Sequence, residues 1–170
     1  FFETNTPGEV IVNTTRVLEV DPTNAYDLTR AEIQGRQQAF EVVNLLKNKV
    51  SGFENAIVEY TGPFIGVRSS RQIAGQYLLT QEDLVGQKRF DDVIAHGGYP
   101  VDIHPPEGDD TDFDAQMLKA RHLPYGAFYD IPYRCLVGDE MKNLITVGRC
   151  ISATFEAQGS IRVSPIAGAI

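Results

Sequence analysis

The longest regular pattern of apolar and polar residues in this chain has the period of an α-helix. From about Thr29 to Lys49, apolar side chains return every three or four positions, and Gln, Arg, Glu and Lys fill the opposite side. Glu32 follows Thr29 at capping-box spacing, Asp27 is a second possible cap, and lysines near the end suit the helix dipole. The pattern predicts one long helix that covers one side of a sheet.

Shorter stretches alternate, or are rich in β-branched and aromatic residues, which is typical of strands. Residues 9–20 alternate, and turn residues separate them from Phe1 and Phe2, so an antiparallel hairpin is predicted. A capping-box pattern at Thr80 predicts a short helix that runs toward Val85. Further extended segments are predicted at 53–60, 64–73, 75–79, 101–104 and 127–137, and a short helix or turn at 90–95.

The C-terminal residues are the most organised part of the sequence. The apolar run 144–147 predicts a buried strand that Gly148 closes with a tight turn. A polar loop rich in small residues follows, and then a helix is predicted to open, with Ser164 as its cap and Pro165 in the first helical position. A strand, a glycine turn and a helix N-terminus together form a platform for an anion or a cofactor, because unpaired N–H groups and the helix dipole point at one place.

Composition and charge limit the classes of partner. The net charge of −8 and the pI of about 4.8 argue against nucleic acid and against an anionic membrane surface, since both require basic residues. No run of about 18 apolar residues predicts a membrane-spanning helix, and no signal peptide opens the chain. Together with the presence of only two cysteines, these features favour a cytoplasmic location.

The two cysteines, Cys135 and Cys150, are too few for a disulfide scaffold and far from C-x-x-C spacing. We expect two unpaired buried thiols, with a redox pair as the alternative. The three histidines are scattered and show no metal-ligand spacing, so no metal is expected.

Arg68 and Arg71 flank two serines, so two cationic forks and two hydroxyls lie in a small space. Ion pairing at the surface of an acidic protein is one account. A wall that binds the carboxylate of a ligand is the other, because guanidinium groups bind carboxylates through two parallel hydrogen bonds. Tyr129 and Asp130 are candidates for lining a pocket, and a core aromatic with a satisfied hydroxyl is the alternative for Tyr129.

Two C-terminal stretches, GRCISAT from Gly148 and EAQGSIRV from Glu156, resemble the flavin-contacting segment of a family of bacterial FAD-dependent oxidoreductases. This family belongs to the glutathione-reductase-like flavoprotein superfamily. Further stretches resemble the same family in the same order, at 8–20, 66–73, 98–104 and 129–134. The chain departs from the family in two ways. The dinucleotide fingerprint G-x-G-x-x-G is absent, and Phe155 stands where a His is expected.

The resemblance implies roles for particular residues. Two groups of residues bind the cofactor. The group around the glycine turn lies near the ribityl chain or diphosphate: Gly148, Arg149 and Cys150. The group before the last helix lies near the pyrimidine edge of the flavin: Ser160, Ile161 and Arg162. Arg68 and Arg71 are the substrate-binding candidates. His104 and Tyr129 are the catalytic candidates, with a structural, hydrogen-bonded histidine as the alternative for His104.

These observations predict an α+β fold with an antiparallel or mixed β-sheet and one long covering helix, as a fragment of a two-domain FAD-dependent oxidoreductase. Residues 1–140 form the substrate-side domain, and 141–170 are a return segment of the FAD-binding domain, with its last strand and the start of its last helix. The parent enzyme transfers hydride between an unknown small organic substrate and FAD, whereas the isolated fragment binds FAD weakly or not at all. The alternatives are a non-catalytic module that binds an anion or small ligand, and a structural or oligomerisation domain that forms a homo-oligomer through an exposed sheet edge.

Overall fold

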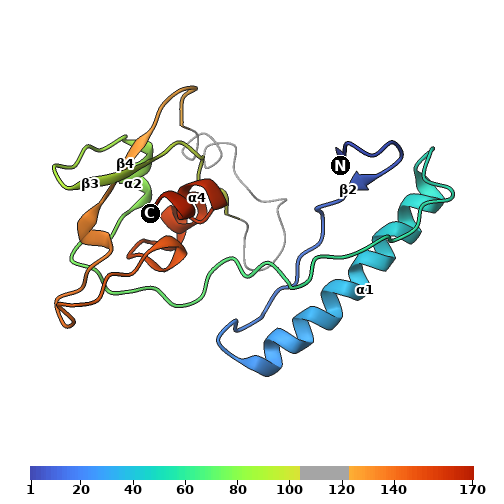
Figure 1. The fold of residues 1–170 in the computed structure, drawn as a ribbon, viewed down its shortest axis with the longest axis horizontal. Helices are drawn as coiled ribbons and strands as arrows, with labels where there is room; N and C mark the ends of the chain where they lie inside the picture. Colours follow the sequence, from blue (N-terminus) through green and yellow to red (C-terminus); the bar gives the residue numbers. More distant parts are fainter. Residues whose placement is uncertain (104–122) are drawn as a thin grey trace. The chain divides into compact units, whose positions relative to one another are not determined.

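The computed structural model describes residues 1–103 and 123–170, which belong to two compact units, Phe1–Gly66 and Val67–Ile170 (Figure 1). The predicted α+β class is confirmed, since each unit combines helix with a two-stranded antiparallel sheet. These two units are defined by which residues pack together. The predicted division at residue 140 separates a substrate-side region from an FAD-binding region instead, and it stays a prediction.

The first unit begins with a hairpin. Strand β1 (Phe2–Glu3) pairs antiparallel with β2 (Val10–Ile11), which confirms the predicted pairing at the start of the chain. The strand predicted over 9–20 is only two residues long, and 53–60 form no strand. Alternation alone was therefore misleading, because an alternating segment becomes a strand only where a second strand pairs with it.

Helix α1 (Ala25–Lys49) confirms the predicted long helix. It begins earlier than predicted, because the side chain of Asn24 accepts a hydrogen bond from the Tyr26 amide (2.9 Å) and caps the helix there. An extended segment of the same unit lies against it, since Gln38 donates from Nε2 to the carbonyl oxygen of Arg16 (3.1 Å).

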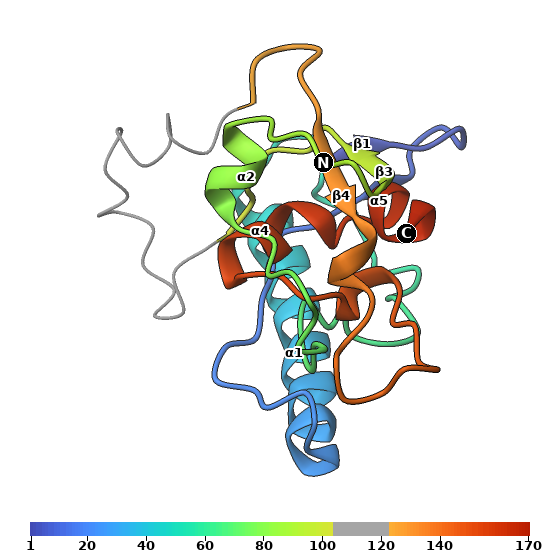
Figure 2. The same cartoon turned by 90° about the vertical axis from the view of Figure 1, so that its left-hand side faces the viewer.

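The second unit contains a pair of strands with short helices around it (Figure 2). Strand β3 (Val93–Gly97) pairs antiparallel with β4 (Tyr129–Pro132), and His96 lies opposite Asp130. The extended conformation predicted at 127–137 is confirmed in β4. The helix or turn predicted at 90–95 is wrong from residue 93 onward, because those residues pair with β4.

The helices of the second unit are short. They are α2 (Gln81–Val85), α4 (Phe155–Ile161) and α5 (Ser164–Ala169), with the 3₁₀ turns η1 (Tyr133–Cys135) and η2 (Gly148–Cys150). The capping box predicted for α2 is confirmed. The Thr80 hydroxyl accepts from the Asp83 amide (3.3 Å), and the Asp83 carboxylate accepts from the Thr80 amide (3.0 Å).

One apolar core holds the second unit together. Leu79 forms a parallel bridge with Ala153, which joins the segment before α2 to the segment before α4. The buried residues come mainly from β4, from α2, α4 and α5, and from the segments next to them. They include Leu79, Leu84, Val101, Tyr129, Ile131, Cys135, Leu136, Ile151, Ala153, Ala157, Ile161 and Ile166.

The C-terminal stretch departs from the prediction. Residues 144–147 form no strand, and three of their apolar side chains are exposed: Leu144, Ile145 and Val147. The chain then turns through η2 and forms α4, where a polar loop was predicted. Helix α5 begins at Ser164 with Val163 as its N-cap residue, so the predicted cap, Ser164, is the first helical residue and Pro165 is the second. The glycine turn and the helix start are therefore present, and the buried strand is not.

Candidate functional site

Three arginines and one aspartate from distant parts of the second unit form a polar group that we call the arginine cluster: Arg68, Arg149, Arg162 and Asp102. Arg162 donates from Nη2 to the carbonyl oxygen of Asp102 (2.8 Å) and to its Oδ2 (3.3 Å). Nη1 of Arg68 lies 3.7 Å from the same Oδ2. Arg149 donates from Nη1 to the carbonyl oxygen of Val67, the residue before Arg68.

Helix α4 positions two sides of the arginine cluster. Gln158 is buried in α4 and donates from Nε2 to the carbonyl oxygen of Arg68 (3.1 Å). Gly159 permits a close approach, because a Cβ at this position would lie only 3.0 Å from the carbonyl oxygen of Asp102. The helix therefore brings Arg68 and Asp102 to the end that carries Arg162.

The arginine cluster has an excess of positive charge. Arg68 and Arg162 pair with the one carboxylate of Asp102, and the guanidinium of Arg149 is near enough for its charge to act on Arg162. The Arg162 side chain is only 13% exposed. Burial lowers the pKa of Arg162, and the positive charges of Arg68 and Arg149 lower it further, against the opposite effect of Asp102. Guanidinium groups held in this way attract carboxylates and phosphates, which they bind through paired N–H groups.

Two other predicted site residues, Tyr129 and Ser160, belong to the core. Both are fully buried, and the Tyr129 hydroxyl lies 2.6 Å from Ser160 Oγ. Because Ser160 donates its own proton to the carbonyl oxygen of Tyr99, it accepts the proton of Tyr129. Burial raises the pKa of Tyr129 to about 12. This is the arrangement of a core tyrosine with a satisfied hydroxyl, and Ile161 is likewise fully buried.

The turn η2 places the other cofactor-binding candidates next to α5. Gly148 has a φ of 69°, in the left-handed region, and a Cβ there would lie 3.5 Å from the carbonyl oxygen of Ala167. Cys150 is exposed, whereas Cys135 is buried, and burial raises the pKa of the Cys135 thiol to about 12. The prediction of unpaired thiols is confirmed, but the prediction that both are buried is wrong for Cys150, because η2 lies at the surface.

Two further candidates lie outside the arginine cluster. Arg71 is exposed and has no ion pair within the part of the chain that the structure describes, and His104 lies outside the described residues. Within 1–103 and 123–170, no group of three or more His, Cys, Asp or Glu side chains is placed to hold a metal ion. In the same residues, no helix has the length and hydropathy needed to cross a bilayer.

Sequence reasoning missed Asp102 and Gln158. It named Asp130 as a candidate for lining a pocket but missed the partners of Asp130 in a second polar group at the β3–β4 pair. In that group the buried carboxylate of Asp130 contacts His96 and Arg89. One signal was available. An aspartate inside an apolar strand is buried only where hydrogen-bond donors surround it.

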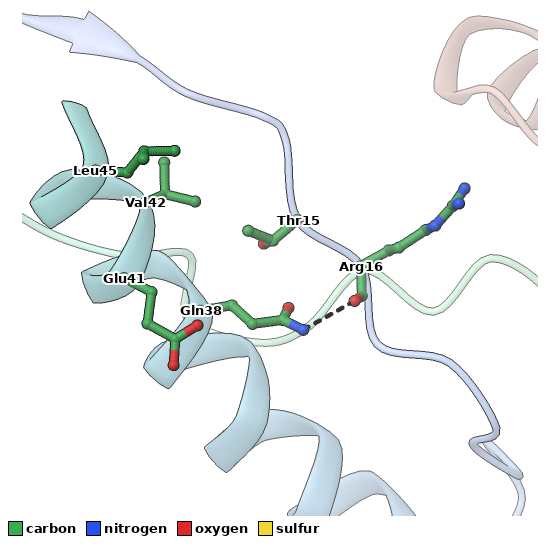
Figure 3. Close-up of a pocket in the computed structure, with 6 residues that line it drawn as sticks. All are labelled: Thr15, Arg16, Gln38, Glu41, Val42 and Leu45. Carbon is green, nitrogen blue, oxygen red and sulfur yellow. Dashed lines mark hydrogen bonds between the residues drawn. The ribbon is translucent and has the colours of Figure 1, made fainter. Parts of the chain in front are cut away.

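In the first unit, α1 and the extended segment beside it line a shallow hollow (Figure 3). Its lining residues are Thr15, Arg16, Gln38, Glu41, Val42 and Leu45. Gln38 donates to the carbonyl oxygen of Arg16, and its buried Oε1 has no hydrogen-bond partner among the described residues. None of the predicted site residues that the structure describes lies in this hollow.

Comparison with known proteins indicates which cofactor the arginine cluster could bind. The family model described as FAD dependent oxidoreductase matches residues 1–170. The chain belongs to the FAD dependent oxidoreductase family. No curated protein and no solved structure matches it. Membership in the FAD dependent oxidoreductases confirms that part of the sequence-based assignment and implies FAD as the cofactor.

The described residues of this FAD dependent oxidoreductase fit the anionic part of FAD better than its ring system. Arg149 and Arg162 are donors suited to a diphosphate, because each carries several N–H groups in a planar fork. The side chains of Ser160 and Ile161 are enclosed in the core and have no surface for a ring. In this conformation the cofactor-binding candidates therefore offer contacts to the diphosphate, through Arg149 and Arg162, and none to the ring through Ser160 and Ile161.

Proposed function

We propose that this chain supplies the substrate side and part of the flavin contact of an FAD-dependent oxidoreductase, in which hydride passes between a small organic substrate and FAD. The arginine cluster is the observation that carries the proposal. FAD supplies the ring that exchanges hydride, and the residues of the chain supply charge and position.

Within the arginine cluster, Arg149 and Arg162 bind the diphosphate of FAD, and Arg68 binds a carboxylate of the substrate. Arg68 is then the contribution of the substrate-side region, 1–140, to ligand binding. Arg149 and Arg162 are the contribution of the return segment, 141–170. The two hydrogen bonds from Arg162 to Asp102 support this assignment, because a side chain already held in place loses less conformational entropy when a ligand binds.

A flavin titration tests the proposal, with fluorescence quenching and a melting scan as readouts. The samples are this chain and a version extended in both directions. We expect FAD to bind the extended version and to bind this chain weakly or not at all, because the absent G-x-G-x-x-G unit holds much of the cofactor in enzymes of this kind. In the extended version, Arg149→Gln and Arg162→Gln should each weaken FAD binding about tenfold, the effect of one charge-assisted hydrogen bond.

Arg134→Gln is the matched control. Arg134 makes a bidentate ion pair with Asp92 (2.9 and 3.2 Å), outside the arginine cluster. A loss of FAD affinity in the two cluster variants, with wild-type affinity in Arg134→Gln, supports the proposal. Equal affinity in all three variants contradicts the role of the cluster.

The same excess of positive charge supports a second candidate, a non-catalytic module that binds a small anion. Inorganic phosphate, added without FAD, is the probe. If the extended version fails to bind FAD, and phosphate raises the melting temperature of the wild type but not of Arg162→Gln, this second candidate replaces the first.

We also propose that the isolated chain associates with itself. Among the described residues, no further strand pairs with the β1–β2 hairpin, and Phe2 and Ile11 on it are exposed. Exposed edges with apolar side chains pair readily with other chains. Light scattering that shows a monomer at all concentrations excludes this association.

A further inference from the structure

A carboxylate at the β3–β4 pair has three hydrogen-bond donors. Asp130 is only 4% exposed. Its Oδ1 lies 2.7 Å from Nη1 of Arg89 and 3.0 Å from Nδ1 of His96, and its Oδ2 accepts from the Phe90 amide (3.1 Å). Burial raises the pKa of Asp130, but the hydrogen bonds from Arg89 and the Phe90 amide, with the charge of Arg89, outweigh it and hold the pKa below its ordinary value. Asp130 is therefore ionised.

The ionised carboxylate determines which nitrogen of His96 carries a proton. A carboxylate only accepts hydrogen bonds, so Nδ1 of His96 is the donor. In the neutral imidazole the lone pair then lies on Nε2. The side chain is 56% exposed, and its Nε2 makes no hydrogen bond with a described residue. His96 thus presents an oriented acceptor at the surface.

Arg89 presents donors beside this acceptor. Its side chain is 51% exposed, and its guanidinium carbon lies 3.9 Å from the centre of the Phe128 ring. The same ring meets His96 edge to face, with centroids 4.9 Å apart. Among the described residues, Asp130 uses only Nη1 of Arg89, so Nε and Nη2 remain as a planar pair of donors.

This polar group lies apart from the arginine cluster. Consecutive residues of a strand point to opposite faces, so the side chains of Tyr129 and Asp130 leave β4 on opposite sides. Tyr129 points to Ser160 of α4, the helix that ends at Arg162. Asp130 and its partners therefore occupy the other face of the strand pair.

We propose that Arg89 and His96 form a second ligand site, for a small hydroxy acid. The carboxylate of the ligand accepts from Nε and Nη2 of Arg89, and its hydroxyl donates to Nε2 of His96. Asp130 is a positioning residue, because it fixes the imidazole tautomer and holds the guanidinium group. A simple carboxylate leaves Nε2 unused, and a simple alcohol lacks the charge that Arg89 attracts. The site requires no FAD and goes beyond the function proposed above.

An NMR titration of the whole chain tests this site, with lactate as the probe. Propanoate, which lacks the hydroxyl, and 2-propanol, which lacks the carboxylate, are the matched comparisons. We expect lactate to shift the imidazole resonances of His96 in a saturable way, assigned through the His96→Gln variant. Propanoate should bind several-fold more weakly, and Arg89→Gln should weaken lactate binding about tenfold or more.

Two further variants separate binding from structure. Arg134→Gln, which removes an ion pair outside the site, should keep the lactate response. Asp130→Asn should change the ¹⁵N shifts of His96 that report the tautomer, which a merely structural role would not do. Equal affinity for lactate and propanoate, wild-type affinity in Arg89→Gln, or a response without saturation overturns the proposal. Arg89 is half exposed, so this variant remains informative even if Asp130→Asn does not fold.

Discussion

At the scale of single residues, a glycine and a tyrosine make a very close contact across the β3–β4 pair. A Cβ added to Gly97 would lie 2.3 to 2.5 Å from atoms of the Tyr129 side chain. That ring is fully buried, and Ser160 holds its hydroxyl, so it cannot move away without losing a hydrogen bond. The size of its neighbour therefore requires a glycine at position 97.

Gly97→Ala should lower the free energy of unfolding by about 1–3 kcal/mol, the usual effect of overpacking a core. Urea unfolding followed by circular dichroism measures the change. Gly168→Ala is the control, because a Cβ there meets nothing within 4 Å and the residue has no positive φ. A similar loss in both variants would contradict the packing explanation.

That the arginines of the cluster meet at one place was not predictable from their spacing in the sequence. Arg68 and Arg162 are far apart in sequence, and no spacing rule connects them; α4 does so through the contacts of Gln158 and Gly159. Arg71, chosen because it lies near Arg68, is exposed and stays outside the cluster, so nearness in the sequence was not a reliable guide.

At the scale of secondary structure, α2 depends on its first turn. Besides the capping box with Thr80, the carboxylate of Asp83 accepts from the Tyr77 hydroxyl (2.8 Å) and pairs with Nζ of Lys88 (3.0 Å). Burial raises the pKa of Asp83, but the Thr80 amide, Tyr77 and Lys88 together lower it more, so the carboxylate stays ionised. A helix of five residues is not stable alone, and these contacts tie it to the segments on both sides.

Thr80→Ala should destabilise the second unit by about 1 kcal/mol, because the amide of Asp83 loses its hydrogen-bond acceptor. Chemical unfolding measures the loss. Thr80→Ser keeps the hydroxyl and should retain most of the stability. If the serine variant is as unstable as the alanine variant, the methyl group of Thr80, rather than the cap, matters.

The elements that local signals define were the ones predicted. Helix α1 has a regular apolar period and α2 has a capping box, and both can be recognised from a short window. The exposed run 144–147 shows that a short apolar segment does not specify a strand. Helix α4 was missed because small residues, among them Ala157 and Gly159, pack tightly in the core without an obvious apolar period.

At the scale of the whole molecule, the two units differ in how much apolar surface they bury. In the first unit, the buried apolar residues among those described are Ala31 and Leu46, both on α1. The second unit has a continuous core from α2 to α5. Since burial of apolar surface supplies most of the stability of a helix in a protein, α1 should open more easily than the second unit.

Hydrogen exchange followed by mass spectrometry tests this difference. Peptides from α1 should exchange at least about tenfold faster than peptides from β4, after correction for intrinsic rates, because a tenfold change corresponds to about 1.4 kcal/mol in opening free energy. Equal protection of α1 and β4 would show that the first unit has a source of stability beyond its own buried residues.

The arginine cluster is assembled from residues that are far apart along the chain. Gln158 and Arg68 are 90 positions apart, Arg149 and Val67 are 82 apart, and Arg162 and Asp102 are 60 apart. Each of these contacts closes a long loop, and the entropy of loop closure opposes its formation until the core around α4 is in place. The cluster should therefore form late in folding. A chain that is still folding carries the same arginines but has no assembled cluster, so the anion binding proposed for the cluster should appear during refolding only when the native state forms.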